Sequence, residues 1–177
     1  MITGPLFLKL RGQDLHRTIS FSMRIAVVLG LVWWLGVATA HARTATGYSE
    51  GKKTTIKLVE VNGVEVEQGT ARAFRAMAKA ASKMGIRIAI RSGFRSHELQ
   101  RLLYRDYRHG WGHLAARPGF SKHQSGRALD IYITDYRVYE WLRKHAGKYG
   151  FKRTVPREAW HWEYIGDETR QARRATS

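Results

Sequence analysis

The sequence contains no cysteine among its 177 residues. This absence excludes disulfide-stapled scaffolds, zinc modules with cysteine ligands and peptidases with a thiol nucleophile. Acidic residues are scarce, because 14 Asp and Glu stand against 31 Lys and Arg and leave a net charge of +17. Internal repeats and low-complexity segments are also missing. Apolar residues are not scarce, at 44% of the chain, so we expect one domain with a core of its own.

The longest apolar run lies near the N-terminus and is short for a membrane span. Residues 25–40 carry no charge, follow Met23-Arg24 and end in the small-residue triplets ATA and AHA, which fit an A-x-A cleavage pattern. A membrane-spanning helix usually needs about 20 apolar residues. We therefore predict that residues 1–42 are an N-terminal extension and secretory signal peptide that begins at Met1 or Met23. A retained membrane anchor through residues 25–40 is the alternative.

Positive charge persists when residues 1–42 are set aside. They hold four basic residues and one acidic residue, so the remainder still carries a net charge of +14. Such a charge attracts polyanions without identifying one, and nucleic acid, anionic lipid and acidic polymers of the cell envelope all qualify. Export favours the last two. We therefore expect an exported monomer, periplasmic or in the cell envelope, that meets anionic envelope polymers and no nucleic acid.

Patterning of the rest of the chain predicts short strands and helices in mixed order. Residues 43–54 are predicted to be a flexible lead-in, and alternation around Asn62-Gly63 predicts a β-hairpin over residues 55–67. The other predicted elements are helices beginning near Thr70, Ser96 and Asp135 and strands at residues 86–90, 127–133 and 160–165. No regular βαβ alternation occurs, so we expect an α+β fold with a small antiparallel sheet and flanking helices over residues 55–166, followed by a basic tail at 167–177.

A glycine-containing loop over residues 110–126 leads into the first chemical motif. Long loops of this kind usually carry function. Between Ser121 and Asp130, the motif places His123 seven positions before Asp130. The intervening Gly126 allows the chain to turn sharply, so the imidazole and the carboxylate can face one cation.

A second motif over residues 158–164 surrounds an imidazole with carboxylates and aromatic rings. A hydrolytic zinc site needs three ligands from His, Asp or Glu, an open position for water and a carboxylate that takes the proton. The two motifs supply such a set. The candidate ligands are His123, Asp130 and His161, and the candidate bases are Glu158 and Glu163.

Three segments together resemble a known family. They read S-x-H-x-x-G-x-A-x-D from Ser121 to Asp130, E-x-W-H from Glu158 to His161, and S-G-F-R-S from Ser92 to Ser96, which Gln100 follows. Their order and spacing are similar to those of VanY-like D-alanyl-D-alanine carboxypeptidases. These are zinc peptidases of the bacterial cell wall, related in fold to the hedgehog signalling domain. The resemblance covers about residues 55–166.

The resemblance implies a role for each matching position. It implies that the three candidate ligands bind Zn²⁺ and that Glu158 is the general base. Arg95 would stabilise the oxyanion or hold the substrate, and Ser121 and Gln100 would contact the peptide. Arg95 suits this role because its guanidinium stays cationic where negative charge develops. Trp160 is predicted to line the substrate groove.

The choice between the two candidate bases depends on where the last strand begins. Glu158 is three positions from His161, and residues three apart on a strand point to opposite faces, whereas Glu163 shares a face with His161. Glu158 can therefore face the metal only if it lies in a turn before the strand.

The function predicted from the sequence is a zinc-dependent metallopeptidase of peptidoglycan stem peptides. D-alanyl-D-alanine carboxypeptidase activity is expected, with L,D-carboxypeptidase and endopeptidase activity left open because the loops do not define the pocket. The alternative is a non-catalytic module on the same fold that binds cell-wall polymers or other polyanions. A complete ligand set with a base favours the enzyme, since a binding module needs no open zinc position. His109 and His113 in the segment H-G-W-G-H can bind a second metal, but a glycine-bounded pair in a loop more often belongs to a lid that faces the substrate or is simply solvated.

Overall fold

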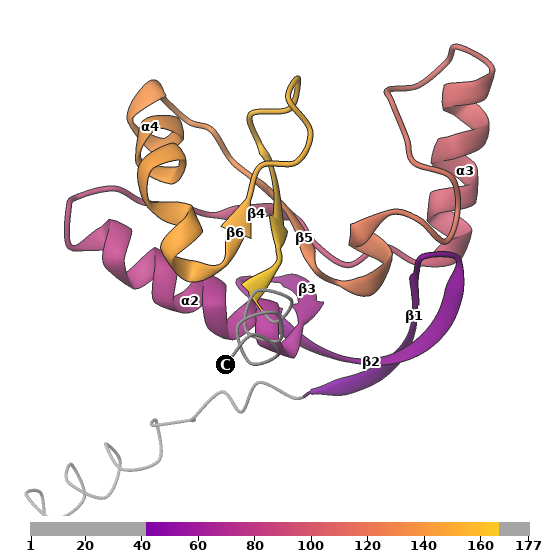
Figure 1. Ribbon diagram of the computed structural model, residues 1–177, viewed down its shortest axis with the longest axis horizontal. Helices are drawn as coiled ribbons and strands as arrows, with labels where there is room; N and C mark the ends of the chain where they lie inside the picture. Colours follow the sequence, from indigo (N-terminus) through magenta and orange to yellow (C-terminus); the bar gives the residue numbers. More distant parts are fainter. Residues whose placement is uncertain (1–41, 167–177) are drawn as a thin grey trace, which may run out of the picture. The chain divides into compact units, whose positions relative to one another are not determined.

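The computed structural model describes residues 42–166. The predicted signal peptide and the predicted basic tail lie, except for Ala42, outside the described residues. Within the described part, no helix is both long and apolar enough to cross a bilayer. This part contains two antiparallel sheets and three α-helices (Figure 1). The predicted α+β class with small antiparallel sheets is confirmed.

The first sheet is formed by consecutive hairpins. Its strands are β1 (Arg43–Ser49), β2 (Lys52–Val61) and β3 (Val64–Glu67), in that order. The turn between β2 and β3 has positive φ angles at Asn62 (51°) and Gly63 (82°). Two such residues in succession are typical of the type I′ turn that matches the twist of a hairpin. The hairpin predicted around Asn62-Gly63 is therefore confirmed.

The flexible lead-in predicted for residues 43–54 is wrong for most of its length. All of β1 pairs with β2, from Arg43 opposite Leu58 to Ser49 opposite Lys52. The outer residues of β1 are polar and exposed, so the strand lacks the alternation that would have revealed it. At Gly47 the chain approaches a neighbouring loop so closely that a Cβ atom would lie 2.9 Å from the carbonyl oxygen of Gln124.

The second sheet carries most of the chemistry. Its strands are β4 (Ile90–Ser92), β5 (Ala128–Ile131), β7 (His161–Tyr164) and β6 (Phe151–Lys152), in that spatial order. The helices α2 (Gln68–Ser82) and α4 (Tyr136–His145) lie on one side of these strands, whereas α3 (His97–Arg108) stands on the other side (Figure 1). The apolar core joins α2 and α4 to the strands, and its largest fully buried side chains include Phe74, Met77, Leu129, Ile131, Leu142 and Phe151.

All three helices begin close to their predicted starts, and each is capped by a side chain. Ser96 Oγ accepts a hydrogen bond from Leu99 N at 3.1 Å, and the Asp135 carboxylate caps α4. α2 begins two residues before Thr70, because the Glu67 carboxylate caps it and accepts hydrogen bonds from the backbone N–H groups of the first turn at 2.7 and 2.8 Å.

The predicted strand at residues 86–90 is present only at its last residue, where β4 begins. Ile88 and Ile90 are buried in the core, so their alternation reflects packing of an irregular segment rather than strand pairing. The other two strands are shorter than predicted but lie within the expected ranges.

A glycine joins the first sheet to the loop that carries His123. Gly126 follows the short 3-10 helix η1 (Lys122–Ser125) with φ at 68°, and its carbonyl accepts a hydrogen bond from Glu67 N at 3.0 Å. A Cβ atom at Gly126 would lie 2.7 Å from Glu67 N. The position therefore requires both a left-handed backbone and the absence of a side chain.

Two glycine substitutions distinguish the cost of the left-handed backbone from the cost of the missing space for a side chain. Gly85 also has φ at 68° but has open space around its would-be Cβ. Gly85→Ala should lower the free energy of unfolding by about 1 kcal/mol, the usual cost of left-handed backbone. Gly126→Ala should lower it by about 2–4 kcal/mol, because Glu67 must also move. Urea denaturation of both variants measures the difference, and equal losses would show that the contact with Glu67 is unimportant.

Candidate metal centre

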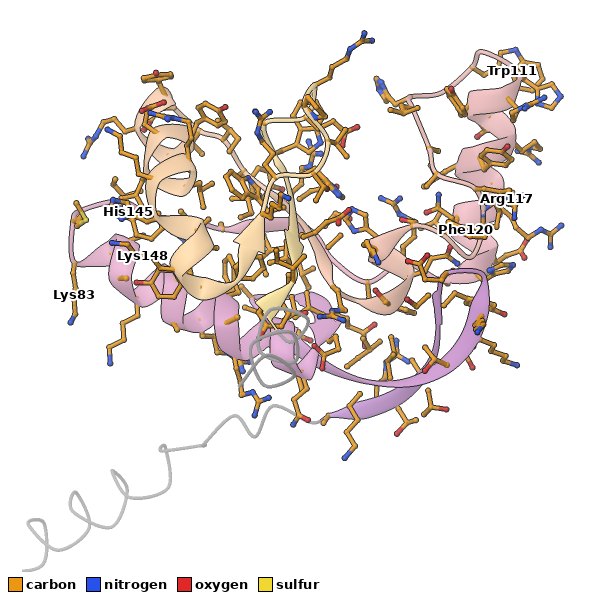
Figure 2. The ribbon with its side chains drawn as sticks, in the orientation of Figure 1. Lys83, Trp111, Arg117, Phe120, His145 and Lys148 are labelled. Carbon is orange, nitrogen blue, oxygen red and sulfur yellow. The ribbon has the colours of Figure 1, made fainter. Side chains whose placement is uncertain are left out.

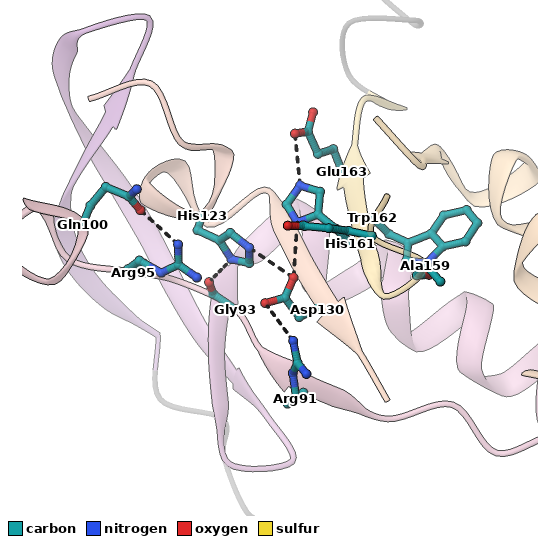
Figure 3. Close-up of polar contacts among 11 residues, drawn as sticks. Arg91, Gly93, Arg95, Gln100, His123, Asp130, Ala159, His161, Trp162 and Glu163 are labelled. Carbon is teal, nitrogen blue, oxygen red and sulfur yellow. Dashed lines mark hydrogen bonds and ion pairs between the residues drawn. The ribbon is translucent and has the colours of Figure 1, made fainter. Parts of the chain in front are cut away.

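Three buried side chains converge on one point. His123 comes from η1, Asp130 from β5 and His161 from β7, and one nitrogen or oxygen of each lies within 4.8 Å of the other two. Asp130 Oδ1 is 3.4 Å from His123 Nε2 and 3.2 Å from His161 Nδ1 (Figure 3). Among residues 42–166, this is the one group of three such side chains placed to share a metal ion.

Strand pairing accounts for part of this convergence. Asp130 and His161 are directly opposite each other in the antiparallel pair of β5 and β7. Side chains in such positions have Cβ atoms about 4.5–5.5 Å apart. His123, seven positions before Asp130, lies in η1, and the chain turns back at Gly126, which brings His123 to the same place. The turn at Gly126 therefore brings His123 to Asp130, and the pairing of β5 with β7 adds His161.

Hydrogen bonds at the outer nitrogens determine which ring nitrogen of each histidine is free. His123 Nδ1 lies 2.7 Å from the carbonyl oxygen of Gly93, which can only accept a hydrogen bond. His161 Nε2 lies 3.2 Å from a carboxylate oxygen of Glu163. When each ring is neutral, the outer nitrogen therefore carries the hydrogen, which leaves the lone pairs of His123 Nε2 and His161 Nδ1 on the side of Asp130, available to a metal ion. Metal-bound histidines usually have such outer partners.

The donor set fits a zinc ion. Two imidazole nitrogens and one carboxylate oxygen are the ligands of a hydrolytic zinc site, which keeps a further position open. Each side chain is at most 10% exposed, so water competes little for the ligand atoms. The residues that would hold Zn²⁺ are the three predicted from the sequence, His123, Asp130 and His161.

The three groups also set each other's charge in the metal-free protein. Burial raises the pKa of Asp130, but hydrogen bonds from His123 and His161 outweigh it and hold the pKa well below its usual range. Burial lowers the pKa of His161, but hydrogen bonds to Asp130 and Glu163 raise it to about 9. The centre therefore keeps an ionised carboxylate, which favours a cation.

The two candidate bases lie on different sides of the His161 ring. β7 begins at His161, and Glu158 precedes it in a turn, so the objection based on strand alternation does not apply. Glu158 Oε2 is 4.0 Å from Nδ1, the nitrogen that faces Asp130. Glu163 instead contacts Nε2. The Glu158 carboxylate is thus next to the ligand atoms, while Glu163 is hydrogen-bonded behind them.

Arg95 is held at the cleft by two contacts. Its backbone N–H donates to the carbonyl oxygen of His123 at 3.0 Å, and its guanidinium donates to Gln100 Oε1 at 3.0 Å (Figure 3). Burial lowers the pKa of the guanidinium, whereas Asp130 and Glu158 raise it. The negative charges of Asp130 and Glu158 therefore attract the guanidinium of Arg95 toward the metal centre.

Gln100 lies outside the cleft. Its side chain is fully buried, and its amide nitrogen donates to the carbonyl oxygen of Ala116 at 2.7 Å while its oxygen accepts from Arg95. Both ends of the amide are therefore used within the protein. The geometry links Arg95 to the loop after α3 and leaves Gln100 no direct path to a substrate.

A cleft of about 610 Å³ surrounds the centre. Its lining includes the three ligands, Arg95, Glu158, Ser121 and Trp160, with His113 and Leu114 from the loop after α3. Trp160 is 36% exposed, and Ser121 is nearly buried. A cavity of about 800 Å³ elsewhere, beside α2, has no His, Asp or Glu in its lining, so its size does not make it a metal site.

Sequence reasoning missed one charged neighbour of the centre. Arg91 lies on β4, with its guanidinium 3.7 Å from Asp130 Oδ2 and 5.6 Å from the centre of the Trp160 ring. It also missed the Gly93 carbonyl that orients His123. An arginine inside a short apolar strand, directly before the S-G-F-R-S segment, is the signal that could have indicated Arg91.

Comparison with known sequences identifies a family. A family model described as "VanY: D-alanyl-D-alanine carboxypeptidase" matches residues 63–167. YodJ of Bacillus subtilis, named as a carboxypeptidase, is 29% identical over 57% of this chain and 46% of its own length. A D-alanyl-D-alanine carboxypeptidase of Enterococcus faecalis is 37% identical over 30% of this chain and 25% of its own length. The chain thus spans less than half the length of these relatives.

Solved structures with the same fold include metal-bound and ligand-bound examples. A Zn(II) complex of a mutant vancomycin-resistance D,D-pentapeptidase VanY is 24% identical, with a TM-score of 0.55 over 66% of this chain and 83% of its own. VanYB in complex with D-alanine-D-alanine is 25% identical, with a TM-score of 0.55 over 66% and 81%. The LD-carboxypeptidase LdcB is 26% identical, with a TM-score of 0.53 over 63% and 64%.

The metal-free protein should lose stability as the pH rises from about 6.5 to about 9. The pKa of a histidine in an unfolded chain is about 6.5, and that of His161 in the fold is about 9. The fold therefore binds this proton more tightly, so the stabilisation is complete below pH 6.5 and is lost as the pH rises through 9. Urea denaturation with a chelator should show the free energy of unfolding fall by on the order of 1–3 kcal/mol.

Two variants test whether His161 causes this pH dependence of the free energy of unfolding. His161→Gln should flatten it, whereas His113→Gln, which changes an exposed loop residue, should leave it intact. An unchanged slope in His161→Gln would assign the effect to another group.

Proposed function

The chain belongs to the VanY family of D-alanyl-D-alanine carboxypeptidases, and from this premise we propose that it is a zinc-dependent metallopeptidase of peptidoglycan stem peptides. One observation carries the proposal. Two imidazole nitrogens and a carboxylate oxygen converge in a cleft, with a second carboxylate and a guanidinium beside them. A hydrolytic site needs each of these groups, and a binding module needs neither the second carboxylate nor an open metal position.

The ligands act through His123 Nε2, Asp130 Oδ1 and His161 Nδ1. A zinc ion held by them supplies Lewis-acid polarisation and lowers the pKa of a water at the site to about 7. Glu158 is the general base in this proposal, because its carboxylate lies on the ligand side of His161. It takes a proton from the attacking water and returns it to the amine that leaves when the peptide bond breaks.

Arg95 stabilises the negative charge that develops on the scissile carbonyl oxygen. Donors to such an oxyanion contribute about 3–4 kcal/mol in comparable sites. Gln100 is a positioning residue, because its buried amide holds the guanidinium of Arg95 rather than the peptide. Ser121 and Trp160, which line the cleft, contact the substrate peptide.

We propose cleavage before a terminal D-alanine. The family description and the D-alanine-D-alanine complex of VanYB support this choice. LdcB, a carboxypeptidase of the LD type, has a similar fold, so the fold itself does not select the bond. The stereochemistry of the residue before the scissile bond must be read by the cleft walls, which the loop after α3 and Trp160 provide.

The proposed activity takes place outside the cytoplasm, in the periplasm or cell envelope, where stem peptides are found. The predicted signal peptide supports export. The net charge of +14 that remains without residues 1–42 supports attraction to anionic envelope polymers rather than recognition of a particular sequence or sugar. The protein is proposed to act as a monomer, because its described residues hold the whole candidate centre in one chain.

The purified chain should release D-alanine from a stem pentapeptide. A chelator should abolish release, and added zinc should restore it. Mass spectrometry of the products distinguishes loss of the terminal D-alanine from cleavage of an L,D bond or a crosslink. Stoichiometric zinc binding without hydrolysis of any wall peptide would instead favour the non-catalytic binding module.

Two matched variants test the carboxylates. Glu158→Gln should lower kcat by about 10²–10⁴-fold and keep zinc, because it removes the base. Glu163→Gln should lower zinc affinity by about 10–100-fold and recover activity when zinc is saturating, because it removes an outer partner of His161. Full activity in Glu158→Gln would exclude it as the base.

Salt should affect binding to whole sacculi more than cleavage of a small soluble peptide. Raising ionic strength from about 0.1 M to about 1 M shortens the screening length from about 10 Å to about 3 Å. Long-range attraction to a polymer is screened by this change, while contacts inside the cleft are affected less. Cosedimentation with sacculi and a D-alanine assay measure the two effects. Equal salt sensitivity would contradict attraction through the basic surface.

A further inference from the structure

The end of α3 and the loop after it expose a group of large side chains. We call residues 107–114 the tip surface. Trp111 is 77% exposed, Leu114 is 61% exposed and Tyr107 is 38% exposed. Figure 2 shows Trp111 at the end of this hairpin, at the far end of α3 from the rest of the described chain. An exposed indole at a projecting tip is unusual for a surface that meets only water.

Local contacts hold Trp111 in this exposed position. Its backbone N–H donates to the carbonyl oxygen of Asp106 at 2.9 Å, and its ring stacks on His109 with centres 4.8 Å apart. His109 Nδ1 in turn lies 2.7 Å from the carbonyl oxygen of Arg105. The indole is therefore presented outward by an ordered turn.

The helix that carries the tip surface contributes little to the core. Gln100 is its one buried residue, and Leu99 and Leu102 are 46% and 40% exposed. Much of the apolar surface of Leu99, Leu102, Trp111 and Leu114 therefore stays exposed in the described part of the chain. A second apolar medium is the natural partner of such side chains.

The charges around the tip surface are positive. Residues 105–117 contain three arginines, at positions 105, 108 and 117, and one acid, Asp106. The Asp106 carboxylate accepts hydrogen bonds from Arg105 at 3.0 and 3.1 Å, so it is already paired. The segment carries a net charge of +2, with Arg117 beside Phe120 rather than beside Trp111 (Figure 2). An anionic partner complements it.

We propose that the tip surface docks onto an anionic lipid bilayer, with Trp111 in the headgroup region. Tryptophan favours the membrane interface because its ring is apolar and its N–H is polar. Arginines beside it favour anionic headgroups. A sugar chain is a poorer match, because residues 105–117 contain no Asn, Gln, Ser or Thr to pair with its hydroxyl groups and their one carboxylate is engaged.

This contact is separate from any membrane contact through residues 25–40. It also involves the cleft, because His113 and Leu114 belong to the tip surface and to the cleft lining. Docking would therefore hold the open side of the cleft beside the bilayer surface.

A single fluorescent label tests the proposal in the full chain. Since the sequence has no cysteine, His113→Cys provides one labelling position beside Trp111. An environment-sensitive dye there should brighten several-fold and shift to the blue with vesicles of equal phosphatidylglycerol and phosphatidylcholine, and should not change with phosphatidylcholine alone. The dye reports only its own surroundings, so binding through residues 25–40 does not produce the signal.

Two further substitutions in the labelled protein show whether the indole is needed. Trp111→Ala should remove most of the signal. Tyr136→Ala, which deletes a 72% exposed aromatic ring at the start of α4, should leave it unchanged. Far-UV circular dichroism confirms that each variant is folded. An absent signal with anionic vesicles, an unchanged one after Trp111→Ala, or a signal with lipid-free sacculi alone would overturn the proposal, the last by assigning the tip surface to a wall polymer.

Discussion

The pairing of Asp130 with His161 across β5 and β7 is the contact on which the centre depends. A buried carboxylate and a buried imidazole are each costly, and the cost falls only when they face one another with good hydrogen bonds. The strand register provides that arrangement. The Gly93 carbonyl and the Glu163 carboxylate then complete the outer side of each ring, so every buried polar group of the centre has a partner. The result is a rigid set of three ligand atoms.

The rest of the fold keeps the apolar core apart from the three ligands and the cleft around them. α2 and α4 cover one side of the four-stranded sheet (Figure 1) and bury its apolar side chains, while the three ligands line a cleft together with residues of the loop after α3. The first sheet supports η1 through Gly126 and through the close approach of Gly47. A change in the core can therefore alter stability without entering the cleft, because the two regions share strands but not side chains.

The ligands and the α+β class were predictable from the sequence because both follow from local patterns. The spacing of seven positions from His123 to Asp130 and the strand around His161 can both be recognised in the sequence. β1 was not, since a polar, exposed strand is defined by its partner rather than by its own residues. The choice of Glu158 rather than Glu163 as candidate base also required the structure, because it depends on the residue at which β7 begins. The roles of Gly93 and Arg91 arise from long-range contacts that no spacing records.

The sparse packing of α3 has a dynamic consequence. A helix whose one buried side chain is the polar Gln100 adds little to the cooperative unit formed by the core, so it can open at a free energy well below that of global unfolding. Gln100 accepts a hydrogen bond from Arg95 and donates one to the carbonyl oxygen of Ala116, so it links this sparsely packed helix to the metal centre. Opening of α3 would release Arg95 and one side of the cleft together, while the ligands stay in place on their strands. One wall of the cleft and the guanidinium proposed to stabilise the oxyanion would then move together.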